Sequence, residues 1–247
     1  MREGRAVSID TASERPVVQA EFDAVVLVDV LCDTTTLVTA AAQRRQVFPA
    51  ASAPAAFALA HNLRDPIIAT SERASWRSGF EMGDSPAALA RRSDARPFVL
   101  ACETGRVLAE RARRWPDVYL ACLRNVGATA RHLALRHERV LVIDSGTDDV
   151  RCEDRIAAAR LARLLVDEGF APLGLETHET LSRWAAADLT LAEWGRSAEE
   201  LRRAGREEDL DFVLAHIDDV DVVCSVSSGC LKTLAPAELG RPLPVIA

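Results

Sequence analysis

Short apolar runs alternate with longer helical patterns along most of this chain of 247 residues. The runs do not alternate polar with apolar residues, which is typical of strands buried on both faces of a parallel sheet. They occupy residues 25–30, 66–69, 98–101, 118–123, 140–143 and 220–226. The helical patterns lie near residues 36–45, 52–62, 86–92, 105–114, 126–137, 153–168 and 197–216. This order predicts an α/β fold, a three-layer α/β/α arrangement with a largely parallel or mixed sheet.

No Gly/Ser-rich or Pro-rich linker interrupts this alternation. We therefore expect one α/β/α domain over residues 22–247, preceded by an irregular N-terminal arm over residues 1–21, which are mostly polar.

Composition and charge exclude several classes of protein. The formal net charge of −7 argues against a nucleic-acid partner, because phosphate backbones are bound by basic surfaces. No apolar run approaches the roughly 20 residues that span a bilayer, and the N-terminus has no basic leader followed by an apolar core. The six cysteines are widely spaced and form no CxxC pair, which indicates reduced thiols. We expect a cytoplasmic protein with no membrane contact.

The segment 24–36, AVVLVDVLCDTTT, carries the clearest chemical signal. Asp29 ends an apolar run and so lies at the carboxyl edge of the expected sheet, where open α/β folds bind ligands. Thr34, Thr35 and Thr36 begin the following helical pattern, and a helix N-terminus favours phosphate. A carboxylate beside an anion site makes chemical sense with a divalent cation between them. The segment therefore predicts a metal-assisted site for a phosphorylated small molecule, although the same residues also serve as ordinary helix caps.

Polar residues follow the other apolar runs as well. The second run precedes Glu72 and Arg73, the third precedes the segment 101–106 (ACETGR), and Asn125 follows the fourth. Ser145 and Gly146 follow the fifth run and come shortly before Glu153 and Asp154 at a helix start. Because carboxyl ends of parallel strands meet at one edge, these groups can converge on one site.

Taken in order, these segments resemble the 2-phosphosulfolactate phosphatase family, the magnesium-dependent phosphatases of coenzyme M biosynthesis. The family pattern DVLRATTT is matched by residues 29–31 and 34–36, and its GER and GFDLGNSP patterns by residues 72–73 and 79–86. A glycine turn near Gly105, an asparagine at Asn125, and an SG turn with an ED helix start at residues 145–146 and 153–154 complete the series.

The resemblance implies a Mg²⁺-dependent phosphatase acting on a small phosphorylated metabolite. The catalytic residues it implies are Asp29, Glu72 and Arg73. The phosphate-binding residues would be Thr34, Thr35, Thr36, Ser85, Arg106, Asn125 and Gly146. The metal ligands would be drawn from Asp29, Glu72, Asp84, Glu153 and Asp154. The nucleophile, water or a carboxylate, stays open, and a homodimer is the default expectation for a soluble enzyme.

Several positions depart from the family pattern. Cys32 replaces an arginine that can clamp an anion, while Asp33, Asp84 and Glu103 add negative charge. We therefore expect a phosphate ester whose other end is neutral or cationic, and not phosphosulfolactate itself. The alternatives are a catalytically degenerate member that binds an anionic metabolite or a protein partner, and a phosphate-recognising lyase or transferase.

Overall fold

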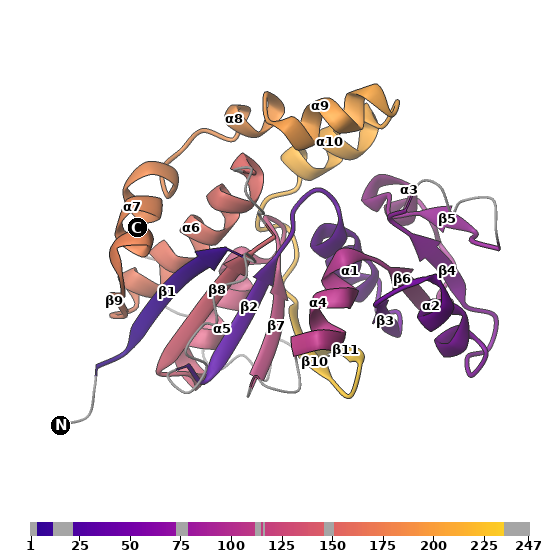
Figure 1. Ribbon diagram of the computed structural model, residues 1–247, viewed down its shortest axis with the longest axis horizontal. Helices are drawn as coiled ribbons and strands as arrows, with labels where there is room; N and C mark the ends of the chain where they lie inside the picture. The colour runs from indigo at the N-terminus through magenta and orange to yellow at the C-terminus, as the bar shows by residue number, and fades with distance from the viewer. Residues whose placement is uncertain are drawn as a thin grey trace.

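A computed structural model describes residues 4–11, 22–72, 79–111, 115, 117–145 and 151–234. These residues form one mixed sheet in the order β5-β4-β6-β3-β11-β10-β7-β2-β8-β1-β9 (Figure 1). The strands are β1 (Ala6–Thr11), β2 (Ala24–Val28), β3 (Val47–Ala50), β4 (Ile67–Thr70), β5 (Met82–Gly83), β6 (Phe98–Ala101), β7 (Asp117–Ala121), β8 (Arg139–Asp144), β9 (Ala171–Pro172), β10 (Val223–Ser227) and β11 (Cys230–Leu234).

The helices are α1 (Asp33–Ala42), α2 (Ala53–Ala60), α3 (Pro86–Ala90), α4 (Glu103–Arg111), α5 (Val126–Arg136), α6 (Cys152–Asp167), α7 (Leu175–Trp184), α8 (Thr190–Glu193), α9 (Arg196–Arg203) and α10 (Glu207–Ala215). This architecture confirms the predicted α/β class with a large mixed sheet. No helix in the described part of the chain has the length and apolar content needed to cross a membrane.

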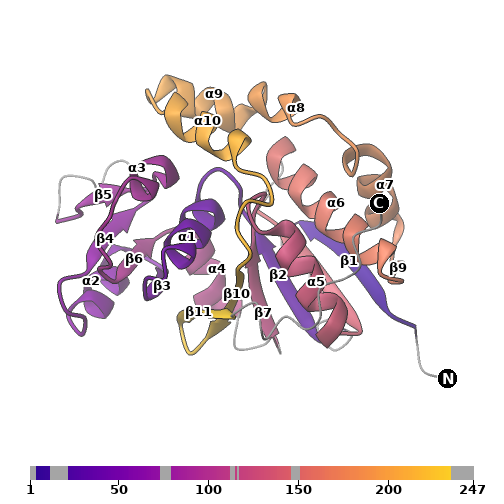
Figure 2. The ribbon, with the colours of Figure 1, turned by 180° about the vertical axis from the view of Figure 1, so that it is seen from behind.

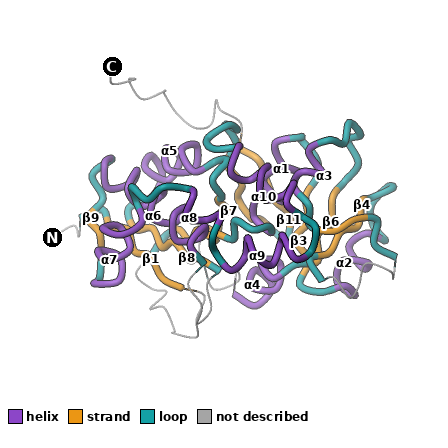
Figure 3. The backbone as a smooth tube through the Cα atoms, turned by 90° about the horizontal axis from the view of Figure 1, so that it is seen from above, coloured by secondary structure: helices purple, strands orange, loops and turns teal. Residues whose placement is uncertain are grey.

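The sheet consists of two parallel blocks joined by an antiparallel hairpin. One block contains β9, β1, β8, β2 and β7, and the other contains β3, β6, β4 and β5. The β10–β11 hairpin lies between them and pairs antiparallel with β7 on one side and β3 on the other. Seen from behind, α5 and α6 cover the first block (Figure 2). Seen from above, α9 and α10 lie over the middle of the molecule, between the two blocks (Figure 3).

The unbroken apolar runs arise because the central strands are buried on both faces. In β2, Val26 and Val28 join one hydrophobic core with α5 and α6, whereas Val25 and Leu27 join a second core with α1. All five residues of β2 are buried. Successive side chains of a strand point to opposite faces of the sheet, and here both faces are covered by a hydrophobic core. Every position of β2 is therefore apolar, which explains why this run does not alternate polar with apolar residues.

The expectation of an irregular arm over residues 1–21 is wrong for residues 6–11. These residues form β1, which pairs in parallel with β8, and Val7 and Ile9 are almost completely buried. Ser8 and Asp10 alternate with these apolar residues, and that mixture made the segment look polar. The pairing partner lies about 130 residues away, so no local pattern points to it. Residues 12–21 lie outside the described part.

Gly105, in the first turn of α4, lies against the end of β3. A Cβ atom at this position would lie 2.2 Å from the carbonyl oxygen of Ala50, which is backbone and cannot rotate away. We expect Gly105→Ala to lower the free energy of unfolding by about 3 kcal/mol, the upper end of typical overpacking costs. Urea unfolding measures the change. Gly4→Ala is the control, because nothing lies within 4 Å of its added Cβ; equal effects of the two changes would contradict the prediction.

Candidate active site

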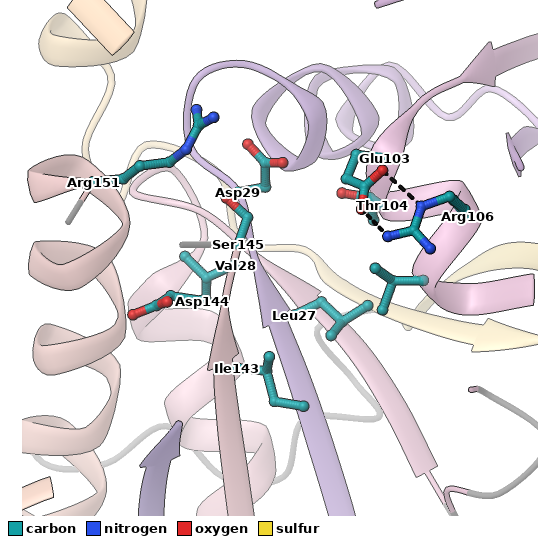
Figure 4. Close-up of a pocket in the computed structure, with 11 residues that line it drawn as sticks. Leu27, Val28, Asp29, Glu103, Thr104, Arg106, Ile143, Asp144, Ser145 and Arg151 are labelled. Carbon is teal, nitrogen blue, oxygen red and sulfur yellow. Dashed lines mark hydrogen bonds and ion pairs between the residues drawn. The ribbon is translucent and has the colours of Figure 1, made fainter. Parts of the chain in front are cut away.

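A cleft with a volume of about 410 Å³ lies where β2, β6 and β8 end. Its lining residues are Leu27, Val28, Asp29, Glu103, Thr104, Arg106, Val107, Ile143, Asp144, Ser145 and Arg151. Asp29 lies between Arg151 on one side and Glu103 on the other, with Leu27 and Ile143 below it (Figure 4). The carboxyl edges of the two parallel blocks therefore meet at Asp29. Of the predicted site residues in the described part of the chain, Asp29 and Arg106 line this cleft.

Thr34, Thr35 and Thr36 are fully buried, and their hydroxyls bind backbone oxygens. Thr34 Oγ1 donates to the Asp29 carbonyl at 2.6 Å, and Thr35 Oγ1 donates to the Val30 carbonyl at 2.7 Å. Thr36 Oγ1 donates to the Asp84 carbonyl at 2.7 Å. The three threonines thus fix the loop that carries Asp29, and none of them is among the residues that line the cleft.

Negative charge accumulates around Asp29. Partial burial raises the pKa of Asp29 well above its usual range, and the carboxylates of Asp33, Asp154 and Glu153 act in the same direction. The Arg151 guanidinium opposes them. Asp33 is itself buried, and desolvation raises its pKa to about 6 although the Thr104 N–H donates to its Oδ2 at 3.0 Å. Several carboxyl groups near one cleft favour a cation there.

Glu153 and Asp154 open α6 side by side but have different surroundings. Asp154 accepts hydrogen bonds from the Val30 N–H at 2.7 Å and the Ser145 hydroxyl at 2.6 Å, so both of its oxygens are used within the fold. Glu153 is only 1% exposed, and within the described residues neither of its carboxylate oxygens has a hydrogen-bond partner. A buried carboxylate without a partner is costly unless something else compensates its charge. Glu153 is therefore the better-suited metal ligand of the two.

Asp84 and Ser85 lie in the contact between α3 and α10. Arg206 Nη1 lies 2.7 Å from Asp84 Oδ1, and Arg206 Nε lies 2.7 Å from Asp209 Oδ2. Ser85 caps α3, accepting from the Ala88 N–H, and donates to Asp209. In this arrangement Asp84 is bound to a guanidinium and Ser85 to structural partners.

The remaining candidates are dispersed. Asn125 is fully buried and bonds the Cys122 N–H and the carbonyls of Leu120 and Val222, which gives it a structural task. Arg106 lines the cleft, but it is paired with Glu103 and Glu110. Glu72 is exposed just after β4 and does not line the cleft. Arg73 and Gly146 lie outside the described residues.

Two arginines were missed by sequence reasoning, Arg151 beside Asp29 and Arg206 beside Cys32 and Asp84. Arg151 lines the cleft and also an adjoining hollow of about 400 Å³ that contains Cys32, Asp84 and Arg206. Arg206 Nη2 lies 3.5 Å from Cys32 Sγ, so a guanidinium reaches the neighbourhood of Cys32 from the α9–α10 connection. Arg151 precedes a predicted helix carrying two acids, a signal that could have been noticed. Arg206 lies in a charged stretch with no local feature that distinguishes it.

The residues present are compatible with Mg²⁺. Within the described residues no three His, Cys, Asp or Glu side chains form a ready-made metal site. Mg²⁺ does not require one, because it retains several waters and commonly takes one or two carboxylates. Asp29 and Glu153 supply hard oxygen donors, and the unpartnered oxygens of Glu153 leave a charge that a cation would neutralise.

Comparison with known proteins identifies the family. A profile of the 2-phosphosulpholactate phosphatase family matches residues 10–229. A protein of Deinococcus radiodurans named "Probable 2-phosphosulfolactate phosphatase" is 28% identical over 232 residues, covering 87% of this chain and 89% of its own. Proteins of the same name from Caldanaerobacter subterraneus and Gloeobacter violaceus are 24% and 29% identical, covering 85% and 78% of this chain and 90% and 84% of theirs. The chain belongs to the 2-phosphosulpholactate phosphatase family.

Proposed function

We propose that this protein is a Mg²⁺-dependent phosphatase that hydrolyses the phosphate monoester of a small metabolite in the Asp29 cleft. The observation that carries the proposal is the buried, unpartnered carboxylate of Glu153, which does not line the cleft but lies close enough to Asp29, at the end of β2, to raise the pKa of Asp29. Membership of a family named for a phosphatase supports the reaction class.

Each charged group at the cleft has a distinct task in this proposal. Asp29 and Glu153 would hold the cation, and a cation there would supply positive charge to stabilise the phosphoryl group as the leaving oxygen departs. Arg151 binds the equatorial oxygens, because it lines the cleft beside Asp29 and is oriented by the Ser197 hydroxyl at 3.2 Å. Thr34 holds the Asp29 backbone in place by accepting its N–H and donating to its carbonyl.

The cleft wall supports a substrate with one anionic end. Leu27, Val107 and Ile143 form an apolar surface next to Asp29. The charged neighbours on this wall neutralise each other, since Arg106 pairs with Glu103, and Asp144 pairs with Arg155 at 3.0 Å. A second anionic group would find little uncompensated positive charge there. We therefore propose a phosphate ester with a neutral or cationic remainder in preference to phosphosulfolactate.

The test is phosphate release from phosphosulfolactate, sugar phosphates and amino-bearing phosphate esters, with Mg²⁺ or with excess chelator. We expect Mg²⁺-dependent release and a higher kcat/KM for the neutral and cationic esters than for phosphosulfolactate. A preference for phosphosulfolactate would contradict the specificity, and release unaffected by chelator would contradict the metal dependence.

One observation favours a second candidate, a family member that binds an anionic metabolite without turning it over. The three threonine hydroxyls predicted to contact phosphate bind the backbone instead. Calorimetry on the same esters separates the two candidates, because binding without phosphate release supports the second and rejects the first.

A further inference from the structure

A second polar pocket lies at the amino end of the parallel strand β7, whereas Asp29 lies at the carboxyl ends of the parallel strands. It has a volume of about 810 Å³ and lies among β7, α5 and the β10–β11 hairpin, which are adjacent in Figure 2. Its lining includes Tyr119, His132, Arg136, His137, Ser225 and Lys232. Ala121, at the carboxyl end of β7, pairs with Val28 next to Asp29, whereas this pocket begins at Asp117, the amino end of β7. The two cavities share no lining residue.

The strand register places three polar side chains in one row. Ser225 pairs with Tyr119 on one side and with Lys232 on the other. Directly opposed residues on neighbouring strands project from the same face of a sheet, so all three point toward the face that α5 covers. Lys232 is the single lysine among the 30 basic residues of the chain.

Two histidines hold the phenol of Tyr119. Tyr119 Oη lies 2.9 Å from His137 Nε2 and 3.2 Å from His132 Nε2, and all three residues are buried. A phenol has one proton, so it donates to one imidazole and accepts an N–H from the other. Burial raises the pKa of Tyr119 to about 12, which keeps the phenol neutral at physiological pH. The group therefore adds no negative charge to the pocket.

The remaining lining residues are mostly hydrogen-bond donors. Arg136 and Lys232 contribute two positive charges, and Ser225, Ser227 and Ser228 contribute hydroxyls. Asp117, which is exposed, supplies the one carboxylate among the lining residues. A second carboxylate, Asp23, lies next to the pocket, with its Oδ1 3.7 Å from His137 Nδ1. The lining residues themselves carry two positive charges and one negative charge, in a protein whose net charge is −7. Phosphate groups accept several charge-assisted hydrogen bonds at once and suit such a donor set.

We propose that this pocket is a second anion site, which binds a small phosphate-bearing molecule through Arg136, Lys232 and the serine hydroxyls beside Tyr119. The two sites share no lining residue, so anion binding here can be tested separately from the proposed phosphatase activity.

The chain offers a site-specific test because it contains one tyrosine and one lysine, both in this pocket. Tyrosine labelled with ¹³C gives a single NMR reporter at Tyr119, and ¹⁵N-labelled lysine gives one at Lys232. The Asp29→Asn variant is titrated with inorganic phosphate, glycerol 2-phosphate or chloride at constant ionic strength. We expect saturable shifts of both reporters with at least one phosphate probe and none with chloride. The tighter probe shows whether the pocket takes free phosphate or an ester.

Variants then assign the binding to the pocket. We expect Arg136→Gln and Lys232→Gln each to weaken binding about tenfold, as read from the Tyr119 signal. Arg131→Gln is the matched control, since Arg131 lies on the same helix but pairs with Asp221 outside the pocket. Circular dichroism confirms that the variants are folded. Reporter shifts that stay linear in phosphate, or binding that persists in the Arg136→Gln/Lys232→Gln double variant, would overturn the proposal.

Discussion

Asp29→Asn is expected to reduce phosphate release by about a thousandfold or more, while the protein stays folded. The substitution keeps the size of the side chain but removes the charge that we propose holds Mg²⁺ in the cleft. Because the pKa of Asp29 is raised by burial and by neighbouring carboxylates, removing its charge also relieves repulsion. The free energy of unfolding without Mg²⁺ should therefore be unchanged or higher. Glu153→Gln is expected to act in the same direction on both quantities.

The control for this result is Glu103→Gln. Glu103 lines the same cleft, but its carboxylate is paired with Arg106 and about half exposed, so the loss of its charge should change kcat less than tenfold. Steady-state kinetics with saturating Mg²⁺, together with urea unfolding in chelator, measures both effects. Full activity in Asp29→Asn would remove Asp29 from the mechanism. Equal losses in Asp29→Asn and Glu103→Gln would show only a general effect of charge.

Arg206→Ala is expected to lower the free energy of unfolding by about 3–5 kcal/mol, the range for breaking a buried ion pair from one side. The guanidinium lies between Asp84 and Asp209, which are 5% and 2% exposed, and without it both carboxylates would be buried close together. The lost contacts join α10 to the segment before α3, so the connection between α9 and α10 should loosen first.

Arg203→Ala provides a matched comparison three residues earlier in the chain. Arg203 is 71% exposed and pairs with Glu199 along α9, so its removal should cost less than about 1 kcal/mol. Urea unfolding followed by circular dichroism compares the two variants, and hydrogen exchange locates the loosened segment. Similar costs for Arg203→Ala and Arg206→Ala would refute the structural role given to Arg206.

The sequence predicted the strands that are buried on both faces, because their composition is distinctive. The predicted run 98–101 coincides with β6, and the run 140–143 lies within β8. The strands β1, β3, β5, β9 and β11 were not predicted, and β5 and β9 have only two residues each. Their conformation depends on pairing with distant segments, which local propensity does not encode. The helix expected over 197–216 is interrupted between α9 and α10, where Gly205 has φ = 64°.

The position of Asp29 at the carboxyl edge of the sheet was predicted from the sequence, whereas the contacts of its neighbours were not. A threonine hydroxyl at a helix start can bind a ligand or a backbone carbonyl. Which partner it binds depends on whether the preceding loop brings a carbonyl within hydrogen-bond distance. Thr36 bonds the carbonyl of Asp84, 48 residues away, a contact that no spacing rule predicts. Glu153 and Asp154 likewise cannot be told apart from the sequence. In the structure the Asp154 carboxylate accepts two hydrogen bonds, whereas the Glu153 carboxylate has no hydrogen-bond partner among the described residues.

The place of the β10–β11 hairpin has a consequence for the order in which the chain can fold. Residues 223–234 lie in the middle of the sheet, although they are synthesised after every other strand in the described part of the chain. Until they emerge from the ribosome, β7 and β3 present unpaired edges, which are ready templates for association with other chains. Closing the sheet then requires contacts of long sequence separation, and these form slowly. During synthesis there is thus a period in which both parallel blocks of strands have been made but the hairpin that joins them has not. Protection by chaperones matters most in this period.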